Sequence, residues 1–226
     1  MKVNNSLEET IDAYGDDHLG SSATTPLRAD AFELSNPKKV ELIQEKVAEI
    51  LEILGMDLTD DSIKGTPNRV AKMYVNEIFG GLHPDKKPKA STFSNKYKYG
   101  EILVEKNITL YSTCEHHLLP IVGKAHGAYI SKGTVVGLSK MNRIVQYYAQ
   151  RPQVQERLTL QIVEELKQVL GTEDVACVID AKHLCVNSRG VRDISSSTIT
   201  SEFGGAFKNK ETKREFLDYI QLDTEF

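Results

Sequence analysis

The sequence predicts an α+β protein with an antiparallel sheet, preceded by an N-terminal helical region. Three observations support this fold class. Apolar residues recur at helical spacing in the first third of the chain, and β-branched and aromatic residues dominate residues 102–130. Two further helical segments then separate those residues from a last group of strands. Strands, then paired helices, then strands again are the order of an α+β fold with an antiparallel sheet.

The N-terminal part divides into a tail, two helices and a connector. The chain pattern predicts a mobile polar tail over residues 1–37, helices over 38–55 and 66–81, and a connector over 82–99. Gly55 supplies the stop of the first helix. Thr66 is the expected N-cap of the second helix, with Pro67 at its first position. We therefore expect residues 38–99 to form an N-terminal helical region and residues 100–226 to form the main domain.

The main domain is predicted to alternate between pairs of strands and pairs of helices. Its expected elements are strands over 102–114 and 121–130, helices over 137–150 and 154–171, and strands over 175–186 and 197–207. Pro152 stands at the start of the longer helix. One face of that helix is apolar through Val154, Leu158, Ile162, Leu166 and Val169.

Composition limits the classes of function. The 226 residues include 28 Lys and Arg against 32 Asp and Glu, and the net charge of −4 argues against a nucleic-acid binder. The 3 cysteines cannot form a disulfide framework, which favours a reducing compartment. We see no secretory signal and no apolar run near the ~18 residues of a membrane span. The expectation is a cytoplasmic protein with no membrane partner.

Two short Cys and His clusters indicate a metal site. Cys114 and His117 can converge if the chain turns after the first strand, and His183 and Cys185 would project from one face of a later strand. Cys114, His117 and Cys185 form a ligand set that suits Zn²⁺ and leaves a coordination position for water, as in catalytic sites. His116 and His183 would remain for proton transfer. Alternatively, the cluster is a structural four-ligand zinc site that His117 or His183 completes. Cys177 lies in an apolar strand and is expected to be a core thiol.

Basic residues and one carboxylate complete the candidate site. Ser139 is a candidate helix N-cap whose neighbours could bind phosphate. The basic candidates are Lys140, Arg143, Arg189, Arg192, Arg69 and Lys72. Each could instead be an ordinary surface charge, and the chain has no phosphate-binding glycine loop. Glu156, beside Gln155, could accept two N–H bonds from a guanine edge, or could be a solvated residue favoured by the helix dipole.

Six segments of the chain resemble GTP cyclohydrolase I. In order, they are TPNRVAKM, STCEHHLLPIVGKAHGAYI, GLSKMNRIV, RPQVQERLT, HLCVNSRGVRD and TSEFGGAF, and they span roughly residues 40–220. The resemblance implies the tunnelling fold. It also implies the zinc-dependent conversion of GTP and water to 7,8-dihydroneopterin triphosphate and formate, which is the first step of pterin and tetrahydrofolate biosynthesis.

The same resemblance implies roles for individual residues. Cys114, His117 and Cys185 would bind one zinc ion per subunit, and His116 and His183 would transfer protons. Glu156 would bind the guanine edge, with Gln155 beside it. The ribose and triphosphate would be faced by Ser139, Lys140, Arg143, Arg189, Arg69 and Lys72. The family's homodecamer of two pentamers, with active sites at subunit interfaces, is the implied assembly.

Three other functions compete with this interpretation. A zinc nucleobase deaminase requires H-x-E with P-C-x-x-C, and a zinc alcohol dehydrogenase requires a dinucleotide fingerprint; the sequence has none of these motifs. A structural zinc module would have four protein ligands and no affinity for GTP.

Overall fold

The computed structural model describes residues 21–89 and 91–223. Residues 1–20 of the predicted tail lie outside these ranges, and residues 21–35 form neither helix nor strand. Part of this segment nevertheless contacts the folded chain, because the Lys39 ammonium donates to the Ala31 carbonyl at 2.8 Å.

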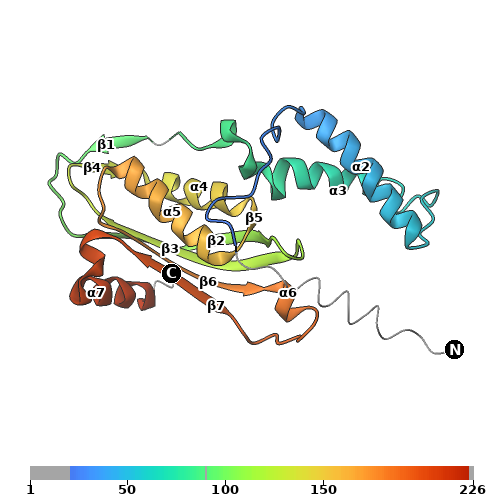
Figure 1. The fold of residues 1–226 in the computed structure, drawn as a ribbon. Helices are drawn as coiled ribbons and strands as arrows, with labels where there is room; N and C mark the ends of the chain where they lie inside the picture. Colours follow the sequence, from blue (N-terminus) through green and yellow to red (C-terminus); the bar gives the residue numbers. More distant parts are fainter. Residues whose placement is uncertain (1–20, 90, 224–226) are drawn as a thin grey trace.

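Two helices form the N-terminal region and extend away from the sheet (Figure 1). They are α2 (Asn36–Ile53) and α3 (Thr66–Met73). The Ser35 hydroxyl caps α2 by accepting from the Lys38 amide. The prediction that Thr66 caps α3 is wrong: Gly65 holds that position, and the Thr66 hydroxyl accepts a hydrogen bond from the Arg69 guanidinium instead.

The predicted second helix changes type before it ends. After Met73 the chain continues as the π-helix η1 (Tyr74–Ile78) and the 3₁₀ turn η2 (Gly80–Leu82). The predicted connector contains a further 3₁₀ turn, η3 (Pro84–Lys86), and the short strand β1 (Thr92–Ser94), which pairs with β4 (Thr134–Val136).

The central sheet has five strands in the order β5-β2-β3-β6-β7. Its members are β5 (Pro152–Gln153), β2 (Ile102–Cys114), β3 (Pro120–Ile130), β6 (Val175–His183) and β7 (Thr198–Phe203). The four longer strands pair antiparallel, as predicted. The sheet is mixed, however, because β5 pairs parallel with the end of β2. That pairing places Gln153 opposite Cys114.

Helices cover both faces of the sheet (Figure 1). On one face lie α4 (Leu138–Ala149) and α5 (Gln155–Leu170), and α7 (Lys210–Gln221) lies on the other. The predicted apolar face of α5 is confirmed, since Leu158, Ile162 and Leu166 are buried against strand residues. Helix α7, which the sequence did not lead us to expect, packs Phe216 against Phe207. Within the described residues, no helix combines the length and apolarity that a membrane crossing requires.

Two predicted strands end early, and one predicted helix cap is wrong. The strand predicted over 175–186 ends at His183, and the chain turns into the short helix α6 (Leu184–Asn187), stabilised by the Ser188 amide and hydroxyl donating to the Leu184 carbonyl. Cys185 therefore does not share a strand face with His183. The strand predicted over 197–207 stops at Phe203, before a 3₁₀ turn. Helix α4 begins at Leu138 after Gly137, so Ser139 lies inside its first turn and is not the N-cap.

Candidate functional site

A pocket of about 450 Å³ opens at one end of the sheet. Strands β2 and β6 both run antiparallel to β3, so their carboxyl ends meet at this end of the sheet, beside the start of α5. The pocket is lined by Ser21, Cys114, His116, Gln153, Val154, Gln155, Glu156, His183 and Cys185. Six of the predicted site residues thus share one cavity, of a size typical for small-molecule sites.

Cys114, His117 and Cys185 form a group that could hold a metal ion. Their ligand atoms all lie within 4.8 Å of one another. Cys114 is the last residue of β2, and the tight turn that follows, closed by the Leu118 amide donating to the Cys114 carbonyl, brings His117 back toward it. Cys185 reaches the group from the first turn of α6. Two sulfur ligands and one imidazole are a donor set that suits Zn²⁺.

The three cysteines differ in their surroundings. Cys185 has a raised pKa, first because it is partly buried and then because it hydrogen-bonds to the neighbouring Cys114. A cation bound between two thiols this close would stabilise both of them as thiolates. Cys177, by contrast, is fully buried in β6, and burial raises its pKa to about 12. The expectation that Cys177 is a core thiol is confirmed.

The two remaining histidines lie in the same pocket. The His116 Nδ1 lies 3.6 Å from the Cys114 sulfur. The His183 Nε2 lies 2.8 Å from the Gln155 Oε1. Burial lowers the pKa of His183, and the nearby Glu156 carboxylate partly opposes this effect. His183 therefore favours its neutral form more than an exposed histidine does.

Gln155 fixes the tautomer of His183. Its amide nitrogen lies within hydrogen-bond distance of the Ile179 carbonyl, the Thr198 carbonyl and the Thr200 hydroxyl, at 3.2, 2.8 and 3.1 Å. Since that nitrogen donates to the sheet, Oε1 can only accept, and His183 must carry its hydrogen on Nε2. Gln155 is only 1% exposed. Its amide is thus committed to the sheet and to His183.

Glu156 is exposed and lines the pocket from the first turn of α5. Its neighbours Gln155 and Arg157 are buried, whereas Glu156 stays exposed, so its carboxylate is open to a ligand. This placement agrees with the expected carboxylate facing a cavity.

The predicted basic residues do not all gather at this pocket. Arg189 lies beside it, since its guanidinium contacts the His117 imidazole of the candidate metal group. Lys140 and Arg143 line a separate cavity, together with Lys86, Lys89 and residues of α4. Arg69 hydrogen-bonds to Thr66 within α3, whose last turn carries Lys72, and Ser139 is exposed on α4. Within the described part of the chain, these five residues do not line the Cys and His pocket.

Comparison with known proteins identifies the family. The family model of GTP cyclohydrolase I matches residues 43–221. The chain belongs to the GTP cyclohydrolase I family. It is 72% identical to the GTP cyclohydrolase 1 of Flavobacterium johnsoniae, over an alignment of 224 residues that covers 99% of this chain and 100% of the relative. It is 53% identical over 198 residues to that of Klebsiella pneumoniae, which covers 87% of this chain and 89% of the relative. The resemblance seen in six sequence segments is confirmed.

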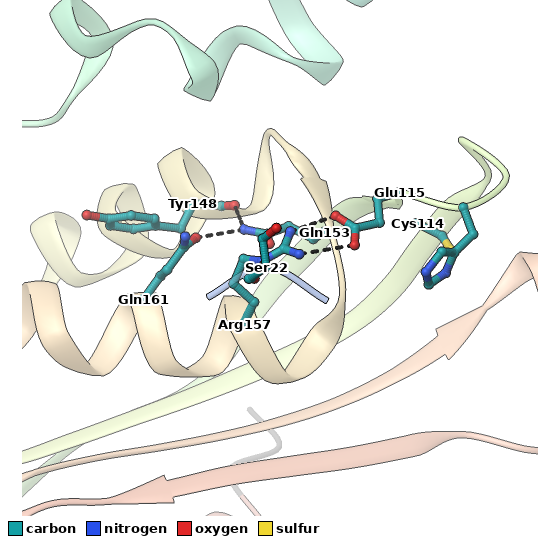
Figure 2. Close-up of polar contacts among 8 residues, drawn as sticks. Ser22, Cys114, Glu115, Tyr148, Gln153, Arg157 and Gln161 are labelled. Atoms are coloured by element: carbon teal, nitrogen blue, oxygen red, sulfur yellow. Dashed lines mark hydrogen bonds and ion pairs between the residues drawn. The ribbon is translucent and has the colours of Figure 1, made fainter. Parts of the chain in front are cut away.

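In this member of the GTP cyclohydrolase I family, two charged residues beside the pocket were not predicted from the sequence. Figure 2 shows Arg157 and Glu115 facing each other beside Cys114. Both lie inside segments that resemble the family, yet nothing in the sequence around either residue indicates that the two side chains pair. Their significance comes from tertiary pairing, which only the fold reveals.

Proposed function

We propose that this chain converts GTP and water to 7,8-dihydroneopterin triphosphate and formate, as the names of its relatives and its pocket suggest. The observation that carries the proposal is that two thiols, with the His117 imidazole beside them, share one cavity with two further histidines and an open carboxylate. A structural zinc module would not require the additional histidines and the carboxylate. We also propose the tunnelling fold for the domain over residues 100–226, and a cytoplasmic location, where the thiols would stay reduced.

Zinc is the metal that the donor set fits best, with Cys114, His117 and Cys185 as ligands. Bound there, the ion would supply Lewis acidity toward water and leave one coordination position open. Arg189, beside His117, places a cation where the triphosphate of a bound nucleotide could be held.

His116 and His183 carry protons during the reaction. Opening of the purine imidazole ring at C8 requires a proton at N7, and the later release of formate and the rearrangement of the ribose require further transfers. Because Gln155 occupies Nε2 of His183, proton exchange with the substrate uses Nδ1 of that ring. Gln155 thereby acts through His183, while Glu156 binds the N–H groups of the guanine edge.

A fluorescence assay tests the proposed reaction. Purified protein given GTP should produce a fluorescent pterin and one equivalent of formate. A chelator should abolish both products, and added zinc should restore them. Formate without pterin would refute the proposed reaction. Full turnover in protein shown to be metal-free would refute the role of zinc.

The assembly we propose is a homodecamer of two pentamers with active sites at subunit interfaces. One support is the separation of Lys140 and Arg143 from the Cys and His pocket, since a neighbouring copy could bring them to it. A second is the open sheet edges: in the described chain, β7 has no partner on its outer side, and β2 is paired there only at Thr113 and Cys114. Both edges expose apolar side chains, with Ile199 67% and Tyr111 62% exposed.

Mixing two inactive variants tests this assembly. Light scattering should give a mass about ten times the 25.3 kDa of the chain. Cys185→Ser and Lys140→Ala, each impaired alone, should regain activity when they are unfolded and refolded together, because about a quarter of the sites would then combine two intact halves. If each site lay within one chain, the mixture would show no gain over the separate variants.

A further inference from the structure

Arg157 is a charged side chain enclosed at the edge of the pocket, only 3% exposed. Its two terminal nitrogens donate to Glu115, Nη1 to Oε2 at 2.7 Å and Nη2 to Oε1 at 3.0 Å (Figure 2). Parallel contacts of this kind fix the relative orientation of the two groups as well as their distance. The third nitrogen, Nε, donates to the Ser22 carbonyl at 2.7 Å.

The two partners belong to the two working parts of the site. Glu115 lies in the turn between the candidate metal ligands Cys114 and His117, and Arg157 follows Glu156 in the first turn of α5. The backbone of the turn is tied to the same region, because the Glu115 amide donates to the Gln153 carbonyl at 3.0 Å. This turn, residues 114–117, is called the metal turn below. It is held against the start of α5 by both its main chain and a side chain.

The same guanidinium also holds the N-terminal segment. Ser22, whose carbonyl it binds, follows Ser21, which lines the pocket. Arg157 thus joins three parts of the pocket wall that are far apart in the sequence: the N-terminal segment, the metal turn and the helix that carries Glu156.

An ion pair enclosed in this way is a poor device for stability alone. Removing two charges from water costs free energy that their attraction only partly returns, and apolar residues of similar size are often as stabilising. Precise placement of neighbouring groups is a role that apolar residues could not supply, because it depends on directed hydrogen bonds.

We propose that Glu115 and Arg157 are a positioning pair, which sets the metal turn relative to Glu156 so that the metal and the purine meet in the right geometry. The inference deepens the proposed function and rests on it for the identity of the purine, but its effect on the metal turn is independent of turnover.

The test uses variants that keep most of the volume and alter the pairing. Arg157→Lys keeps the charge but loses the fork of donors, and Glu115→Gln keeps the shape but loses the charge. The zinc dissociation constant of the folded protein, measured without GTP by competition with a chromophoric chelator, should rise about 10- to 100-fold in each variant. With zinc saturating, kcat/KM for GTP should still fall about tenfold or more, since a misplaced site loses rate.

A remote ion pair on the same helix provides the matched control. Lys167 of α5 pairs with Glu164 and Glu173, and Lys167→Met should lower thermal stability while leaving zinc affinity and kcat/KM unchanged. The double variant Glu115→Gln/Arg157→Lys should lose no more zinc affinity than the worse single variant, because both act through one contact. Glu115→Asp, which keeps the charge, serves if either variant fails to fold, and it should show the same losses in smaller degree.

The outcomes separate the two proposals. Wild-type zinc affinity and kcat/KM in the pair variants, with only a stability loss like that of the control, would overturn the positioning role. Absence of pterin formation in the wild-type protein would instead refute the proposed function. The zinc dissociation constants of the variants would still decide whether the pair positions the metal turn.

Discussion

Replacing Cys185 with serine should abolish both zinc binding and turnover. A serine hydroxyl remains protonated at neutral pH and is a hard ligand, so it cannot replace a thiolate at a zinc ion held by Cys114 and His117. We expect zinc affinity to fall by at least about 100-fold and pterin formation by at least about 1,000-fold. Metal analysis of the purified variant and the fluorescence assay measure the two losses.

Cys177 supplies the control for that variant. Its thiol is fully buried in β6, away from the pocket, and its pKa of about 12 keeps it protonated. Cys177→Ala should therefore retain zinc and turnover, and lose about 1 kcal/mol of stability for the removed sulfur. Full zinc content in the Cys185→Ser protein, or loss of zinc from the Cys177→Ala protein, would contradict the ligand assignment.

The sequence predicted the interior of the main domain because its periodic patterns reflect burial. Leu158, Ile162 and Leu166 recur at helical spacing, and all three lie under α5 against the sheet. Helix α7 follows the same rule, since Phe216 and Ile220 are one turn apart and pack together with the cluster on the far face. Its many charged residues and short apolar stripe concealed that pattern.

Element ends were harder to predict because they depend on local competition for hydrogen bonds. The segment from 175 to 186 is mostly apolar and continues so past His183, yet β6 stops at His183, where the pairing with β3 ends opposite Ile121. Cys185 still reaches Cys114, because a helical turn after the strand returns the sulfur to the same pocket. The predicted ligands thus do lie together, but Cys185 reaches them from a helical turn and not from the strand face that the sequence predicted.

Polar partnerships inside the site could not be predicted from spacing at all. Gln155 looks like a pocket residue in sequence, but its amide is enclosed by sheet carbonyls and the His183 ring. Arg157 looks like a surface residue of an amphipathic helix, but it is enclosed against Glu115. In both cases every partner lies at least 24 residues away, so only the folded chain defines it.

Replacing Glu156 with alanine should remove guanine recognition while leaving the fold intact. A carboxylate that accepts two N–H bonds from the guanine edge rejects bases that lack those donors, and such sites discriminate by large factors. We expect kcat/KM for GTP to fall by about 10³- to 10⁴-fold. Because Glu156 is exposed, the thermal midpoint should stay within about 2 °C of the wild-type value.

Selectivity distinguishes recognition from a general loss of activity. Inosine triphosphate lacks the 2-amino group, so the wild-type protein should strongly prefer GTP to it, and Glu156→Ala should bring the two kcat/KM values close together. Glu156→Gln, whose amide has one acceptor and one donor group, should show a preference for GTP between those of the wild-type protein and Glu156→Ala. The control is Glu164→Ala, which alters an exposed carboxylate on the same helix, away from the pocket, and should change neither value. A Glu156→Ala protein that keeps the wild-type preference for GTP would show that the carboxylate only stabilises the start of α5, because its charge would then matter to the helix dipole and not to the base.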